Sequence, residues 1–146
     1  MLCVKAMGYV KVKFTVSNIH KPNLKSELDL LADTGAIYTV LSRERLLELG
    51  VEPRDKRRFK TADGRVIERD VGAVEIEIKG HSTYSIVILG EPSDAEVLGA
   101  ITLEELGLQV DPATGEVKPL ELLLLRLNDQ SKFRTRNYTN LYTLDT

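Results

Sequence analysis

The stretch Leu30-Leu31-Ala32-Asp33-Thr34-Gly35-Ala36 decides how this chain is interpreted. A short, mostly apolar run over residues 28–32 leads directly into Asp33, and Thr34 and Gly35 follow, so we expect a strand that runs into a tight turn. An isolated Asp in a loop is usually a turn former or a helix cap. Here an apolar strand precedes the carboxylate, and neighbouring backbone N–H groups can hold it. Asp33 is therefore the candidate catalytic residue.

Asp33 cannot act alone in this type of chemistry. A carboxylate activates water when a second carboxylate shares its proton, because two close carboxylates do not both ionise readily. The chain contains a single Asp-Thr-Gly segment. We therefore expect a homodimer in which each copy supplies one Asp33.

Further strands are predicted from the spacing of apolar residues. Residues 10–16 and 74–78 alternate apolar and polar, which indicates strands with one buried face. Residues 84–89 are apolar apart from Ser85, and for this run we expect a strand buried on both faces. Two-residue hairpin chemistry is present at Asp63-Gly64, and residues 111–115 form a second turn.

Two short helices are expected. Ser42 is placed to cap a helix that ends before Gly50, and Thr102 has capping-box spacing to Glu105 ahead of a stop at Gly107. Together with the strands, these signals predict a mostly β fold with one or two short helices.

Composition excludes several classes of protein. The 146 residues are 42% hydrophobic and 29% charged, which is ordinary for a globular domain and rules out a wholly disordered chain. The net charge of -2 argues against a dedicated nucleic-acid binder. Cys3 is the single cysteine, so no internal disulfide forms. No apolar run has the length of a membrane span and no signal peptide is evident, so we expect a cytoplasmic protein that acts on neither membrane nor nucleic acid.

Two other groups of residues are candidate sites. Five of the seven residues 54–60 are basic, and we favour a solvated face leading into the following hairpin over a nucleic-acid patch, since Phe59 is the only aromatic residue there. His20, His81 and Cys3 lack a recognised metal-ligand spacing. We therefore expect no metal and no cofactor.

Three segments resemble parts of the retropepsin-like (retroviral-type) aspartic proteases. By this resemblance the chain would be a single-domain cellular member of that family. Residues 33–36, followed by residues 39–42, resemble the active-site segment, and residues 61–65 resemble the flap hairpin that closes over substrate. Residues 97–107 resemble the apolar-apolar-Gly strand and short helix near the end of the family domain. The resemblance implies a closed acid-protease barrel over residues 1–127, with residues 128–146 left as a polar C-terminal arm that contacts the dimer partner or moves freely.

The resemblance also implies a role for each matching residue. Asp33 would supply half of the catalytic pair, and Thr34 would hydrogen-bond across the dimer axis. Gly35 would let the substrate backbone approach closely. Flap residues would exclude water when closed. Substrate contacts are implied for Ala36, Ile37, Ala62, Asp63 and Gly64.

The chain departs from the retroviral pattern at linked positions. Ile37 and Tyr38 stand where acidic residues are common, and Ala100 stands where Arg commonly follows the late Gly. Two functions therefore remain open. One is a homodimeric aspartic endopeptidase, favoured by the Asp-Thr-Gly segment, with residues 122–127 or the following arm in the interface. The other is a catalytically silent module of the same fold that binds a peptide or protein partner in its cleft.

Overall fold

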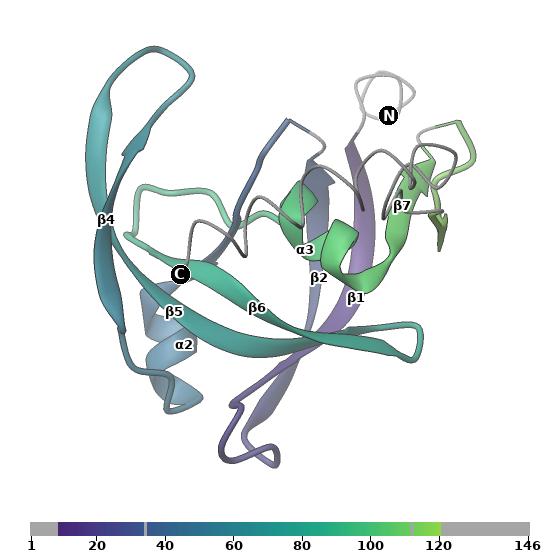
Figure 1. Cartoon of the computed structure of the whole chain (residues 1–146), viewed down its shortest axis with the longest axis horizontal. Coiled ribbons are helices and arrows are strands. Elements are labelled where there is room, and N and C mark those ends of the chain that lie inside the picture. Colours follow the sequence, from purple (N-terminus) through teal and green to yellow (C-terminus); the bar gives the residue numbers. More distant parts are fainter. Residues whose placement is uncertain (1–8, 34, 112, 121–146) are drawn as a thin grey trace, which may run out of the picture.

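The computed structural model describes residues 9–33, 35–111 and 113–120 (Figure 1). The mostly β prediction is confirmed, with two short helices in this part of the chain. The elements in chain order are β1 (Tyr9–Ser17), β2 (Lys25–Asp33), β3 (Thr39–Ser42), α2 (Arg43–Glu48), β4 (Asp55–Lys60), β5 (Val66–Ile78), β6 (His81–Gly90), α3 (Ala100–Leu106), β7 (Leu108–Asp111) and β8 (Glu116–Pro119).

Six strands form one sheet in the order β2-β1-β5-β6-β3, with β4 paired to β5 beside this path. Every pairing is antiparallel except that of β3 with β6. β7 and β8 form a separate hairpin. β5 is long enough to pair with β4 at its beginning and with β6 and β1 further along, so the β4–β5 hairpin extends from the body of the sheet (Figure 1).

The segment Val97–Leu98 bonds to both end strands of the sheet. Val97 exchanges two backbone hydrogen bonds of 2.9 Å with Val40 of β3. Leu98 donates its N–H to the carbonyl of Leu31, at 2.9 Å, and its own carbonyl accepts the N–H of Asp33, at 3.1 Å. The end of β2 is therefore fixed by backbone bonds just where Asp33 stands.

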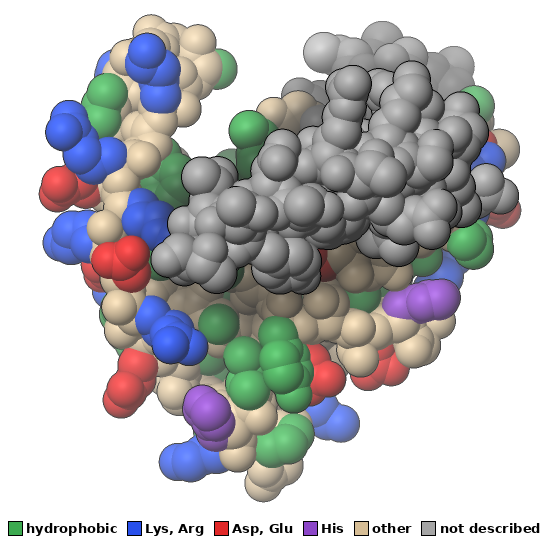
Figure 2. Space-filling model, in the orientation of Figure 1, with side chains coloured by type: hydrophobic (Ala, Val, Ile, Leu, Met, Phe, Trp, Pro, Cys, Tyr) green, Lys and Arg blue, Asp and Glu red, His purple; other side chains and the backbone are tan. Residues whose placement is uncertain are grey.

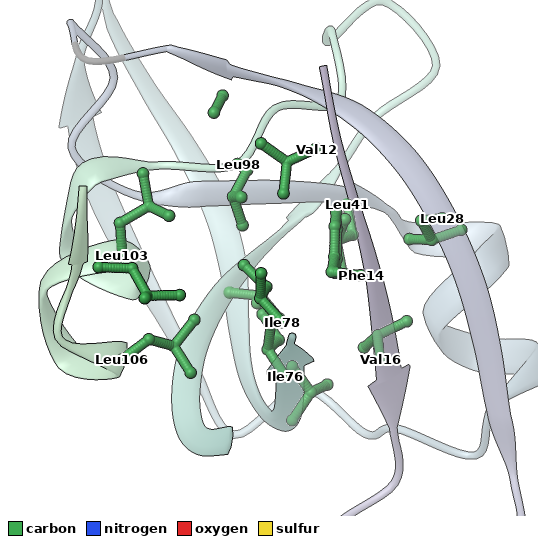
Figure 3. Close-up of a cluster of buried hydrophobic side chains, with 14 of the residues drawn as sticks. Val12, Phe14, Val16, Leu28, Leu41, Ile76, Ile78, Leu98, Leu103 and Leu106 are labelled. Carbon is green, nitrogen blue, oxygen red and sulfur yellow. The ribbon is translucent and has the colours of Figure 1, made fainter. Parts of the chain in front are cut away.

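Alternating apolar residues form the core, as predicted for β1 and β5. Side chains of these strands converge with others from β2, β3 and α3 (Figure 3). The labelled members of this buried cluster are Val12, Phe14, Val16, Leu28, Leu41, Ile76, Ile78, Leu98, Leu103 and Leu106.

The prediction that residues 84–89 are buried on both faces is wrong for residues 84–86 of β6. Tyr84 and Ile86 are 63% and 38% exposed, whereas Ser85 and Val87, which alternate with them, are buried. Successive side chains of a strand point to opposite faces, and one face of β6 opens to solvent here. A short, mostly apolar run does not itself distinguish one buried face from two.

Helix α2 forms as its sequence predicts. The Ser42 hydroxyl accepts a hydrogen bond from the N–H of Arg45, at 3.1 Å, which caps the first turn. Gly50 follows the helix with φ of 75°, a left-handed conformation that glycine adopts without strain.

Helix α3 begins earlier than its sequence suggested, so the capping-box prediction is wrong. The residue that precedes the first turn is Gly99, and Thr102 lies inside the helix, where it is buried. Its hydroxyl bonds to side chains of other elements in place of the helix end. The predicted stop at Gly107 is confirmed, with φ of 72°.

The β4–β5 hairpin turns through three residues, not the two predicted. The Gly64 N–H donates to the Thr61 carbonyl at 2.9 Å, and the Thr61 N–H donates to the Arg65 carbonyl at 2.8 Å. Gly64, with φ of 90°, is the third loop residue, after Ala62 and Asp63. The second predicted turn also forms, because the Gly115 N–H bonds to the Asp111 carbonyl between β7 and β8.

Several predictions fall outside the described residues. They concern Cys3, the role of Thr34, residues 122–127 as an interface and the arm over residues 128–146. Within the described part of the chain, no helix is both long and apolar enough to cross a membrane.

Candidate active site

Asp33 is the last residue of β2, and its carboxylate is held by the turn that follows. Its Oδ1 accepts the N–H of Gly35 at 2.8 Å, and its backbone carbonyl accepts the N–H of Ala36 at 3.0 Å. The side chain is half-buried. In the described residues, Oδ2 makes no hydrogen bond.

Gly35 keeps the space beside this carboxylate open. A Cβ at this exposed position would stand 3.3 Å from Asp33 Oδ1, which is closer than most side-chain contacts. The predicted site residues Ala36 and Ile37 follow directly, and the Ile37 side chain is 62% exposed although it is apolar. The loop therefore offers a carboxylate and an apolar surface next to each other.

The first backbone N–H groups of helix α3 donate hydrogen bonds to the loop that follows Asp33. Ala100 donates to the carbonyl of Ala36 at 2.8 Å, and Ile101 donates to the carbonyl of Ile37 at 3.0 Å. The first N–H groups of a helix have no partner within the helix. Here carbonyl groups of the loop after Asp33 accept the hydrogen bonds of these N–H groups, so the helix fixes the position of the loop.

Gly99 is required for this contact. A Cβ at Gly99 would lie 2.4 Å from the carbonyl carbon of Tyr38 and 2.7 Å from the carbonyl oxygen of Ile37. Both are backbone atoms, so no side-chain rotation can relieve the overlap. The close approach explains why glycine follows the apolar pair Val97–Leu98.

A buried chain of hydroxyl groups fastens the same region. Thr102 Oγ1 lies 2.6 Å from Thr39 Oγ1 and 2.9 Å from Ser85 Oγ, and Thr39 Oγ1 accepts the N–H of Gly99 at 2.9 Å. All three side chains are at most 1% exposed. Sequence reasoning missed this network because the three residues come from β3, β6 and α3 and share no local pattern. Their burial as polar residues is the only signal, and it requires the structure.

The β4–β5 hairpin touches the segment after Asp33 through two aromatic rings. The rings of Tyr38 and Phe59 meet edge to face, with centroids 5.5 Å apart. Beyond this contact the hairpin rises clear of the described surface around it (Figure 2). Its predicted tip residues Ala62, Asp63 and Gly64 are all exposed.

Asp63 is used within the hairpin loop. Its carboxylate accepts hydrogen bonds from the Thr61 hydroxyl and from Arg65, whose Nε lies 3.0 Å away. These bonds, the one from Thr61 first, hold the pKa of Asp63 below its ordinary value. Asp63 therefore shapes the tip as an ionised group.

Three ion pairs connect the base of the hairpin, helix α2 and the loop after β6. Arg69 of β5 bonds Asp94 through two nitrogens, at 2.7 and 2.9 Å. Arg43 of α2 bonds both Asp70 of β5 and Glu91. The Arg69 hydrogen bonds are the main cause that lowers the pKa of Asp94. The hairpin is thus anchored at residues 69–70, and the part between these residues and the tip lies outside these ion pairs.

A fourth ion pair joins α2 to the same loop. The Glu96 carboxylate accepts hydrogen bonds from two nitrogens of Arg45, both at 3.0 Å, and from the backbone N–H of Ser42 at 2.8 Å. Hydrogen bonding from Arg45 is the largest cause that lowers the pKa of Glu96. Glu96 immediately precedes the Val97–Leu98 segment, so this pair helps to place the strand end that holds Asp33.

The described residues contain no group of three His, Cys, Asp or Glu side chains placed to hold a metal ion. His20 and His81 are both exposed, and Cys3 lies outside the described part.

Comparison with known families agrees with this geometry. A family model described as aspartyl protease matches residues 12–101, which is more than half of the chain. The chain belongs to the aspartyl protease family. The matched range runs from β1 into the start of α3 and contains both Asp33 and the β4–β5 hairpin. No curated protein is similar enough in sequence to serve as a relative.

Proposed function

We propose that this protein is a retropepsin-like aspartic endopeptidase that acts as a homodimer. The observation that carries the proposal is the position of Asp33. It stands at the end of a strand fixed by backbone bonds, with one carboxylate oxygen held by Gly35 and the other unbonded in the described residues. A family match over the surrounding residues supports the assignment.

Peptide hydrolysis would need two Asp33 side chains, one from each copy. One ionised carboxylate takes a proton from the attacking water, while the protonated partner donates to the peptide carbonyl. Each active site therefore needs one ionised and one protonated carboxyl at the same time. Activity then has a bell-shaped pH profile with an acidic optimum, and needs neither metal nor cofactor.

We infer that the sheet closes as a barrel over a domain of residues 1–127. The Val97–Leu98 segment supports this inference because it bonds to β3 on one side and to β2 on the other. Thr34 and residues 122–127 would form the two-fold interface, and residues 128–146 would be an arm. We expect such a dimer to be soluble and to reside in the cytoplasm.

The β4–β5 hairpin would act as the flap over the bound peptide. Its tip residues Ala62, Asp63 and Gly64 would cover the substrate and exclude water, while Ala36 and Ile37 would contact it from the loop. The Tyr38–Phe59 contact supports this role, since it couples the flap to the loop that carries Asp33.

A silent binding module of the same fold is the second candidate. It is favoured by Ile37, Tyr38 and Ala100, which replace the charged residues common in the retroviral enzymes. In that case the cleft would bind a peptide and leave it intact.

The test is cleavage of a mixed peptide library by the wild type and by Asp33→Asn, from acidic to neutral pH. We expect the wild type to cleave peptides and Asp33→Asn to fold but cleave none, because an amide cannot serve as the base. Asp29→Asn, at an exposed position of the same strand, is the matched control and should cleave normally. Equal cleavage by the wild type and Asp33→Asn would contradict the proposed chemistry, and cleavage by neither would favour the silent module.

A further inference from the structure

The β4–β5 hairpin carries a charge opposite to that of the rest of the protein. Residues 54–70 contain seven basic and four acidic side chains, a net charge of +3, whereas the whole chain carries -2. Figure 2 shows lysine and arginine side chains along this hairpin. Nothing in the proposed catalytic chemistry requires such a separation of charge.

The basic charge is concentrated on one face of β4. Lys56, Arg58 and Lys60 alternate along the strand, so they share a face, and all three are exposed. None of them forms an ion pair within the described residues, whereas Arg57, on the other face, pairs with Asp55. Lys56 and Arg58 stand opposite Asp70 and Glu68 of β5 in the strand register, but Asp70 is already paired with Arg43. The β4 cations therefore keep the capacity to bind an external anion that approaches along the strand edge.

β4 also has an open edge. In the described part of the chain it pairs with β5 alone, so its second edge presents backbone N–H and C=O groups to solvent. Such an edge can accept a further strand from another chain. Charged residues on an edge strand ordinarily repel incoming strands, but a strand with the opposite charge converts that repulsion into attraction.

We propose that the open edge of β4 binds an extended, acidic peptide segment by strand addition. Side chains of the added strand would repeat every second residue, in step with Lys56, Arg58 and Lys60. The bound segment would thus carry Asp or Glu at alternate positions. Given the proposed function, this segment belongs to the protein substrate, outside the bond that is cut, and its capture brings the substrate to the cleft.

An acidic peptide fits this surface better than a nucleic acid does. Single-stranded nucleic acid is held by cations together with aromatic rings on which bases stack. The one aromatic residue of β4, Phe59, points to the opposite face and is packed against Tyr38. The basic face offers charge and a strand edge, which an extended peptide can use together.

The experiment measures binding of fluorescent peptides to the full chain carrying Asp33→Asn, so that cleavage plays no part. The probe alternates Glu with Thr over eight residues. The test protein also carries Arg58→Gln and Lys60→Gln, and the matched control carries Lys11→Gln and Lys13→Gln, an exposed pair with the same spacing on β1. We expect the dissociation constant to rise about 3- to 10-fold for the β4 pair, as loss of two exposed ion pairs implies, and to stay unchanged for the control.

A second probe separates strand addition from simple charge attraction. It has the same sequence with an N-methyl group on every residue, which removes all backbone donors and keeps every charge. We expect its binding to be lost in either strand direction, because each direction turns a different alternate set of N–H groups toward β4. Equal affinity of methylated and unmethylated probes would overturn strand addition. Equal loss in the β4 and β1 variants, or binding of oligouridylate in place of the peptide, would overturn the acidic-peptide site.

This result is independent of the proposed enzyme activity. If the peptide binds through β4 while no library peptide is cleaved, the docking site stands and the peptidase proposal fails. If cleavage occurs and the acidic probe does not bind, the peptidase proposal stands and the docking site fails. A melting curve of each variant confirms that it is folded.

Discussion

The ring of Tyr38 packs edge to face against the ring of Phe59, with centroids 5.5 Å apart and ring planes at 73°. Tyr38 follows Asp33 by five residues, and its backbone is pressed against Gly99. Phe59 lies near the outer end of β4. This one contact therefore links the loop that carries the carboxylate to the hairpin that rises beside it.

Phe59→Ala should loosen the hairpin without unfolding the protein. An aromatic pair contributes about 0.5–1.5 kcal/mol beyond its buried area, so we expect kcat/KM for a cleaved peptide to fall about 2- to 12-fold. Amide exchange over residues 55–68 should accelerate, while exchange in β1 stays slow. Phe59→Tyr keeps the ring and should behave as the wild type. Unchanged hairpin exchange in Phe59→Ala would show that the ring contact does not restrain the hairpin.

Thr102→Val should destabilise the fold because it removes the central member of the buried hydroxyl chain. Valine has nearly the same shape, but it leaves Thr39 and Ser85 with one partner fewer. An unsatisfied buried polar group costs about 1–3 kcal/mol, so the free energy of unfolding in urea should fall by that amount. Thr15→Val on β1 is the control, since no hydrogen bond of its side chain is present in the described residues. A loss in Thr102→Val no larger than in Thr15→Val would contradict the role of the network.

Acid should weaken the anchor at the base of the hairpin. Arg69 lowers the pKa of Asp94 in the folded protein, so the ionised carboxylate stabilises the fold above its unfolded pKa. That stability is lost as the pH falls through the lower, folded pKa. Asp94→Asn should therefore lower the free energy of unfolding by about 1 kcal/mol at neutral pH, and by much less in strong acid. A deficit that is the same at both pH values would show that Asp94 does not act through its charge; Asp29→Asn controls for the substitution itself.

Much of the fold can be predicted from local signals in the sequence. The alternation in residues 10–16 and 74–78 determines which faces are buried, and Ser42 and Gly50 determine the ends of α2 because capping depends on neighbouring residues. Asp33 could be singled out because strand, carboxylate and glycine are adjacent in the chain. These features need no knowledge of distant contacts.

The parts that could not be predicted depend on contacts between distant segments. Thr102 has the spacing of a helix cap, yet its hydroxyl is drawn to Thr39 and Ser85, and Gly99 takes its place at the helix start. The exposed face of β6 at Tyr84 depends on what covers the sheet. The same is true of the Tyr38–Phe59 contact, which joins two segments that no local pattern relates.

In the proposed dimer one active site needs Asp33 from two chains, and mixing of subunits tests this requirement. Wild type and Asp33→Asn are unfolded together in equal amounts, refolded, and assayed at constant total protein, with a tag on one form to confirm that mixed dimers are present. Because only dimers with two Asp33 side chains hold a complete pair, we expect about one quarter of the wild-type activity. Retention of about one half would mean that each chain works with its own carboxylate alone, and would contradict the shared active site.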